Sequence, residues 1–145
     1  MKISTKGRYA LRIMLDLAIN NNGTYISLKE ISSRQEISDK YSEQIINQLS
    51  KAGLVRSVRG AKGGYMLVKK PADYTVGEIL RVMEGTLAPV TCLEDSNNSC
   101  HRENVCVTIE VFQKIKDAID SVVDNITLED LVAREKEKIS SDYII

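Results

Sequence analysis

All three cysteines of the chain and its single histidine fall in one polar stretch, residues 91–107, which reads TCLEDSNNSCHRENVCV. Seven residues separate Cys92 from Cys100, and five separate Cys100 from Cys106. Thiolates bind soft or borderline metals, and three thiolates in one loop can converge on a single site. The stretch lacks the paired Cys-x2-Cys spacing of zinc ribbons, whereas iron–sulfur clusters are held mainly by cysteine thiolates. It therefore favours a cluster over zinc, and three redox-reactive thiols without a metal are the alternative.

The composition indicates one domain of ordinary size, or two very small ones, with a real hydrophobic core. The chain has 145 residues, of which 43% are hydrophobic and 28% are charged. No apolar run reaches the length that spans a bilayer, and the start, MKISTKGRYALRIML, has no small-residue cleavage site. An odd number of cysteines also argues against a simple disulfide framework. We therefore expect a cytoplasmic protein.

The residues that could do acid–base or nucleophilic chemistry form no catalytic constellation. The sequence has no phosphate-binding loop and no metalloprotease motif, and a single histidine leaves no obvious acid–base pair. We expect that the chain is not an enzyme.

Charge divides the chain into two halves of opposite sign. Residues 1–70 carry 13 Lys or Arg and 5 Asp or Glu, whereas residues 71–145 carry 7 and 15. The formal net charge of zero thus hides a strongly basic half and a strongly acidic one. The basic half suits a polyanion, which would repel the acidic half.

The basic half has the element order of a winged helix–turn–helix. Apolar spacing predicts a helix over residues 5–20, capping residues predict helices over 27–35 and 38–51, and two short apolar runs around GAKGG predict a hairpin over 54–70. We expect a mainly α fold with a small β-hairpin wing, in which residues 1–70 form the DNA-binding region.

The third predicted helix would enter the major groove, which accepts one helix with its polar side chains outward. Tyr41 begins its apolar stripe and Ser38 can cap it. Lys40, Gln44 and Asn47 on its outer face suit hydrogen bonds to base edges, whereas the carboxylate of Glu43 there would repel phosphates. Arg59 at the hairpin tip suits a minor groove, and phosphate contacts suit Lys62, Lys6 and Arg8. The alternative for the outward polar residues is a solvated face without a DNA role.

The acidic half adds three predicted helices around the cysteine stretch. Thr75 and Glu78 form a capping box for the first, residues 104–124 form a long second helix, and Thr127 caps the last. We expect residues 71–103 to be a connecting helix with the cysteine loop and residues 104–145 to be a dimerisation region. The long helix has more apolar positions than one small domain covers, and a dimer would match a palindromic site. A core helix within one domain is the alternative.

Four segments resemble the Rrf2 family of bacterial transcription regulators: MKISTKGRYALRIMLDLA, YSEQIINQLSKAGLVRSVRGAKGGYMLVK, TVGEILRVMEG and NITLEDL. The resemblance is strongest to the iron–sulfur cluster regulator (IscR) branch. It implies a winged-helix homodimer that binds palindromic double-stranded DNA, usually as a repressor. It places the helix that reads the DNA sequence, the reading helix, near residues 38–51. It places the wing near residues 59–65, with Tyr65 as the last wing residue. It also implies that Cys92, Cys100 and Cys106 hold a [2Fe–2S] cluster, with [4Fe–4S] as the second choice.

The fourth ligand departs from that branch, where a histidine lies three residues after the third cysteine. Here that position is Ile109, which cannot bind iron. His101, Glu103 and Glu43 are the candidates, besides a residue of the partner subunit. The resemblance also implies that Glu43 couples cluster occupancy to operator choice.

Two other branches and one other class of protein remain as alternatives. The N-terminal, wing and DYII sequences also resemble the cysteine-metabolism repressor (CymR) branch, whose members generally lack the cysteine trio. The nitric-oxide-sensing (NsrR) branch has the trio but often an acidic ligand where this chain has Arg8. An iron–sulfur electron-transfer protein would leave the basic wing and the reading helix without a role.

Overall fold

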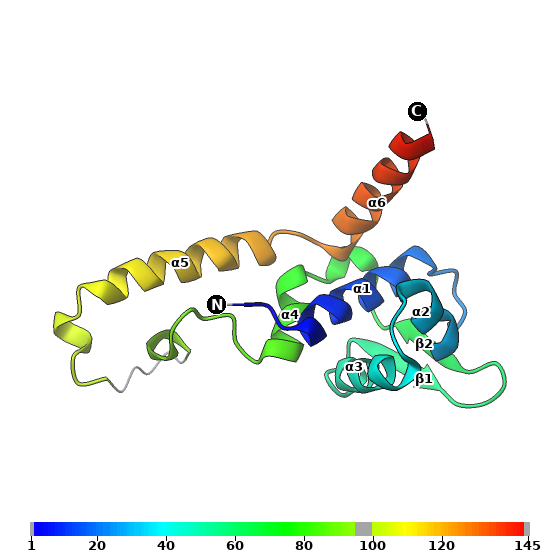
Figure 1. Ribbon diagram of the computed structural model, residues 1–145, viewed down its shortest axis with the longest axis horizontal. Coiled ribbons are helices and arrows are strands. Elements are labelled where there is room, and N and C mark those ends of the chain that lie inside the picture. The colour runs from blue at the N-terminus through cyan, green and yellow to red at the C-terminus, as the bar shows by residue number, and fades with distance from the viewer. Residues whose placement is uncertain (1, 95–99, 144–145) are drawn as a thin grey trace.

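The computed structural model describes residues 2–94 and 100–143, so residues 95–99 of the cysteine stretch and the last two of the DYII end lie outside it (Figure 1). The helices and strands are α1 (Thr5–Ile19), α2 (Leu28–Gln35), α3 (Asp39–Lys51), β1 (Val55–Val58), β2 (Gly64–Leu67), α4 (Val76–Glu84), α5 (Thr108–Val123) and α6 (Leu128–Tyr143). Short 3-10 turns occupy Pro71–Asp73, Thr91–Leu93 and Glu103–Val105. The predicted mainly helical fold with a two-stranded wing is confirmed.

Side-chain caps begin the helices where the sequence predicts them. The Ser27 hydroxyl accepts from the Glu30 amide, and the Glu30 carboxylate accepts from the Ser27 amide, which completes a capping box. Ser38 and Thr75 accept in the same way at the starts of α3 and α4. Each cap satisfies an amide that has no partner inside its helix.

The hairpin pairs β1 with β2 in antiparallel register, from Val55 opposite Leu67 to Val58 opposite Gly64. A third strand-like contact joins Tyr65 to Ile26, through the Ile26 amide to the Tyr65 carbonyl (2.9 Å) and the reverse bond (2.8 Å). Gly64 has a φ of +154°, and a Cβ there would clash with the Ile26 carbonyl oxygen. This close approach fixes the wing against the connection between α1 and α2.

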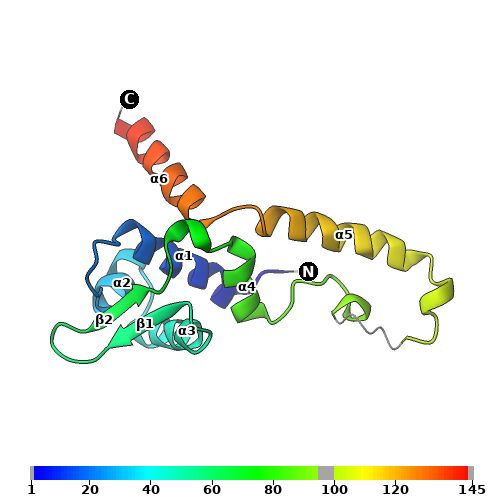
Figure 2. The ribbon, with the colours of Figure 1, turned by 180° about the vertical axis from the view of Figure 1, so that it is seen from behind.

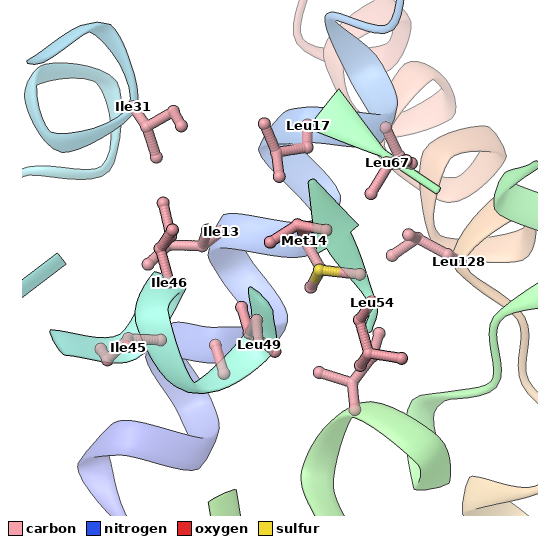
Figure 3. Close-up of a cluster of buried hydrophobic side chains, with 14 of the residues drawn as sticks. Ile13, Met14, Leu17, Ile31, Ile45, Ile46, Leu49, Leu54, Leu67 and Leu128 are labelled. Atoms are coloured by element: carbon pink, nitrogen blue, oxygen red, sulfur yellow. The ribbon is translucent and has the colours of Figure 1, made fainter. Parts of the chain in front are cut away.

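One hydrophobic core joins the first helices, the hairpin and the beginning of α6. Figure 3 shows side chains from these elements pointing toward one another. Among those that the figure labels are Ile13, Met14, Leu17, Ile31, Ile45, Ile46, Leu49, Leu54, Leu67 and Leu128, all of them buried. Leu128 is the first residue of α6, so the C-terminal helix is anchored in the core of the winged helix.

The fully buried side chain of Tyr74 joins the base of the wing to the rest of the molecule. Its hydroxyl donates to the Leu54 carbonyl (2.6 Å) and accepts from the amides of Val68 and Lys69 (both 2.9 Å). Its carbonyl accepts from the Leu128 amide (3.0 Å). One residue thus connects the two ends of the hairpin with the start of α6.

The long helix α5 extends away from this core (Figure 2), and none of its residues is buried. It begins at Thr108, four residues after the predicted start at Asn104. Cys106 has an extended backbone (φ −85°, ψ 98°), and residues Glu103–Val105 before it form a separate 3-10 turn, so the helix does not include residues 104–106. Among the described residues, no helix combines the length and apolar character that a membrane crossing requires.

Replacing Tyr74 with Phe should lower the free energy of unfolding by about 2 kcal/mol, because a buried donor or acceptor left unpaired costs about 1–3 kcal/mol. Urea unfolding followed by circular dichroism measures the change. Tyr25→Phe, at a half-buried tyrosine between α1 and α2, is the control and should change little. Equal effects of the two substitutions would contradict the role assigned to the Tyr74 hydroxyl.

Candidate nucleic-acid interface and cysteine segment

A buried carboxylate fixes α2 against α1 and so sets the direction of α3. The Asp16 side chain is 2% exposed. It accepts two hydrogen bonds from the Arg34 guanidinium (2.8 and 2.9 Å) and one from the Gln35 amide nitrogen (2.9 Å). Paired and hydrogen-bonded in this way, a charge can stay buried. The Asp16 hydrogen bond also raises the pKa of Arg34.

The turn between α2 and α3 depends on a non-glycine residue in a left-handed conformation. Glu36 ends α2 with a φ of +56° and a ψ of 43°. Its amide donates to the Ser33 carbonyl, and the Ile37 amide donates to the Ser32 carbonyl, so the end of α2 is capped. The short reversal brings Ser38 directly to the start of α3.

The outer face of α3 presents the polar residues that the sequence singled out. Its inner face buries Ile45, Ile46 and Leu49. The Tyr41 ring is half-buried, with its centroid 5.8 Å from that of Tyr9 in an edge-to-face contact. The side chains on the opposite face are exposed and include Lys40, Glu43, Gln44 and Asn47, with Ser38 exposed at the cap.

The wing lies beside this face. Arg59 and Lys62 are exposed in the loop that joins β1 to β2. Tyr65 is half-buried, and its pKa is raised by burial and by the negative charge of Glu43. Glu43 of α3 is therefore close enough to Tyr65 of the wing for its charge to act on that side chain. Arg8 on α1 is also exposed.

Two residues that the sequence reasoning missed support the reading helix. Tyr9 packs its ring against Tyr41, and the Arg12 guanidinium lies 5.2 Å from the centre of the Tyr9 ring. The Arg12 Nε atom also donates to the Gln35 side chain (3.2 Å). The three-residue spacing of Tyr9 and Arg12 puts them on one helix face, which was the available signal.

The cysteines lie between α4 and α5, and all three are half-buried. Cys92 is in the 3-10 turn Thr91–Leu93, and Cys106 comes just before α5. The Cys106 sulfur lies 3.2 Å from the Thr108 hydroxyl. This hydrogen bond, the Ile109 and Thr108 amides and the Arg102 charge lower the pKa of the Cys106 thiol. The helix start therefore favours the thiolate, which is the form that binds metal.

In the cysteine segment, as we call residues 91–107, Cys92 and Glu103 line a cavity of about 980 Å³ together with Glu110 of α5. Within residues 2–94 and 100–143, no group of three His, Cys, Asp or Glu side chains lies close enough to hold a metal ion. The thiols thus fit a cluster in ligand chemistry, while their described positions do not converge on one point. Of the candidates for a fourth ligand, Glu103 shares the cavity with Cys92, His101 adjoins Cys100, and Glu43 is on α3 beside the wing.

Three packed helices with an exposed polar face on the third and a basic wing beside it define a winged helix–turn–helix DNA-binding protein. The family model "Rrf2: Iron-dependent Transcriptional regulator" matches residues 3–134. The chain belongs to the Rrf2 family, and the resemblance seen in the sequence is confirmed. It is a transcriptional regulator and not an enzyme.

The relatives include regulators from two branches. The chain is 44% identical over 133 residues to the HTH-type transcriptional regulator CymR of Bacillus subtilis, covering 92% of this chain and 91% of the relative. It is 36% identical over 136 residues to IscR of Escherichia coli, covering 94% and 83%. The structure of CymR from B. subtilis matches with a TM-score of 0.76 at 41% identity (92% and 98% covered), and that of T. potens IscR with 0.75 at 43% (95% and 90%).

Replacing Glu36 with Gly should raise the free energy of unfolding by about 0.5–1 kcal/mol. A left-handed backbone costs a residue with a Cβ about 1–2 kcal/mol, and the larger entropy of unfolded glycine offsets part of the gain. Urea unfolding measures the change. Glu36→Ala is the matched control, because it removes the carboxylate but keeps the Cβ. A gain in the alanine variant as large as that in the glycine variant would show that charge, and not backbone strain, is responsible.

Proposed function

We propose that this regulator binds a palindromic operator as a cytoplasmic homodimer and represses genes for iron–sulfur cluster assembly or sulfur handling. Its affinity for the operator would depend on an iron–sulfur cluster held by Cys92, Cys100 and Cys106. The observation that carries the proposal is that every thiol of the chain lies on one segment between α4 and the exposed helix α5. The helix α4 packs against the winged helix of residues 1–70, which we call the reading head. The lowered pKa of the Cys106 thiol supports it.

Sequence would be read by the outer face of α3. Gln44 and Asn47 carry amide groups that can pair with the edge of adenine, and Lys40 can pair with guanine. Glu43 can accept from the amino group of cytosine, and its negative charge repels phosphates. The negative charge of Glu43 also acts on Tyr65 of the wing, where it contributes to the raised pKa of the tyrosine.

Sequence-independent affinity for DNA would come from the wing and from the N-terminal ends of helices. Arg59 and Lys62 lie at the tip of the hairpin, where they can reach the minor groove and phosphates. The N-terminus of α3 at Ser38 offers backbone amides to a phosphate. Lys6 and Arg8 add positive charge on α1.

Pairing of two subunits would cover α5. Val111 and Val122 of this helix are 56% and 57% exposed. An apolar cavity of about 590 Å³, whose lining includes Leu80, Ile115 and Ile119, lies between α4 and α5. An exposed apolar helix next to an apolar groove is typical of an interface that a second copy covers. Two reading heads related by a two-fold axis match a palindromic operator.

A bound [2Fe–2S] cluster would supply a centre that can be oxidised, reduced or lost. The residues of this chain hold the segment in place for it: the start of α5 stabilises the Cys106 thiolate, and Cys92 opens on the cavity with Glu103. Glu103 is the fourth ligand that this arrangement favours, ahead of His101 and Glu43.

Regulation by cysteine supply, without a cluster, is the second candidate. The 44% identity to CymR favours this candidate, because CymR is the global cysteine regulator of B. subtilis. The presence or absence of iron separates the two candidates. The acidic ligand of the nitric-oxide-sensing branch is replaced by Arg8, which gives that alternative no support.

Replacing Lys62 with Ala should weaken binding to all DNA sequences alike and reduce the slope of log affinity against log salt by about 1, because one phosphate contact is lost. Gln44→Ala should instead relax discrimination at one base position by about 1–3 kcal/mol. Fluorescence anisotropy on operator and altered duplexes at several salt concentrations measures both. A sequence-dependent loss for the lysine variant would contradict the assignment to phosphate.

Protein purified without oxygen should be brown-red and contain iron and sulfide in equal amounts. Single replacements of Cys92, Cys100 and Cys106 with Ser should each abolish or strongly weaken the visible absorption, since thiolates are the main ligands. Asn104→Ala, in the same cavity lining, is the control and should leave the spectrum unchanged. Iron-free protein, or serine variants with the wild-type spectrum, would exclude the cluster and favour regulation without one.

A further inference from the structure

The helix α4 has two faces with different tasks. Val76, Ile79 and Leu80 are buried, and Ile79 belongs to the hydrophobic core. The other face presents Gly77, Arg81 and Glu84, whose spacing of four and three residues aligns them along one side of the helix. These three residues form no part of the reading face or of the cysteine segment.

Arg81 binds the exposed helix α5 at two points. Its Nη2 atom pairs with Asp120 (2.8 Å) and its Nη1 atom pairs with Asp124 (2.6 Å). Lys116 bonds to the other oxygen of Asp120 (2.8 Å), and this bond, followed by Arg81, lowers the pKa of Asp120. The planar guanidinium fixes direction as well as distance, which a single ammonium does not.

Gly77 lets α5 approach closely beside this ion pair. A Cβ at Gly77 would clash with the Asp124 carboxylate, would lie 2.6 Å from the Arg81 guanidinium and 3.0 Å from the Val123 side chain. The C-terminal end of α5 therefore rests on α4 at one defined place. None of the residues of α5 is buried, so these contacts help to set its angle, together with those that it makes to the turn Thr91–Leu93.

Glu84, on the same face of α4, is hydrogen-bonded to the start of α1. Its carboxylate accepts from the Ser4 amide (2.9 Å) and from the Ser4 hydroxyl (2.6 Å). Ser4 is the N-cap of α1, whose Tyr9 packs against Tyr41 of α3. The polar face of α4 thus connects α5 to the helix that supports the reading helix.

We propose that Arg81 is a positioning residue that couples the cysteine segment to DNA binding, through the angle that it imposes on α5 relative to the reading head. The inference rests on the proposed function. Both ends of the cysteine segment lead back to α4: residues 86–90 join one end to α4, and the other end returns along α5 to Arg81. A change at Cys106, at the far end of α5, is thereby transmitted to the head as a change of helix angle.

The test compares operator affinity of cluster-loaded and cluster-free protein for wild type, Arg81→Gln, Arg81→Lys and Arg134→Gln. The last is a matched control, because Arg134 pairs with Glu137 on the surface of α6, where the two side chains are 64% and 67% exposed. We expect the ratio of the two affinities to be the same in wild type and control, close to one in Arg81→Gln, and intermediate in Arg81→Lys. The visible spectrum should be unchanged in all four.

A ratio in Arg81→Gln equal to that of wild type overturns the inference and leaves the proposed function intact. Wild-type protein that contains a cluster but has the same affinity with and without it overturns both. If Arg81→Gln does not fold, the double variant Asp120→Asn and Asp124→Asn removes the same ion pairs from the other side. A retained ratio in that variant also overturns the inference.

Discussion

The structure depends on one buried hydroxyl that holds three backbone groups. Leu54, Val68 and Lys69 lie at the two ends of the hairpin, and the Tyr74 hydroxyl is the point at which they meet. Two-stranded hairpins are at best marginally stable by themselves, so the wing needs an anchor in the core. Because the Tyr74 carbonyl also bonds to the start of α6, the same residue aligns the basic half of the chain with the acidic half.

The division of charge follows this architecture. The helix α3 and the wing are in the basic half, while α5 and α6 carry eight of the fifteen acidic residues of the acidic half. In Figure 1, α5 and α6 extend away from the loop at the tip of the hairpin. DNA bound at that tip would thus meet positive charge first, and the acidic helices would stay outside the phosphate field. Arg81, a cation in the acidic half, is used within the molecule to hold two of its carboxylates.

The sequence predicts what depends on neighbouring residues. The capping residues Ser27, Ser38 and Thr75 mark three helix starts correctly, because a cap bonds to an amide three residues on. Contacts such as Arg81 to Asp124 or Glu84 to Ser4 join residues 43 and 80 positions apart and left no local signal. The start of α5 was predicted four residues too early, since the apolar period continues through Val105 although Cys106 is extended.

The candidate site also combines features that the local sequence predicts with features that only the tertiary structure determines. The exposed face of α3 follows from its helical period, and the structure puts Lys40, Glu43, Gln44 and Asn47 on that face, whereas Tyr41 packs against Tyr9. The closeness of Tyr65 to Glu43 was not visible in the sequence, because the pairing of β2 with Ile26 determines where Tyr65 lies. The spacing of the cysteines indicates ligand type and number, but three thiols in a polar loop do not specify a common point in space.

Titration of one oxygen-free preparation with its operator, before and after chelation of its iron, tests the central claim most directly. The account predicts that loss of iron changes the dissociation constant at least about tenfold, or about 1.4 kcal/mol. An unchanged dissociation constant in protein that has demonstrably lost its iron would contradict it.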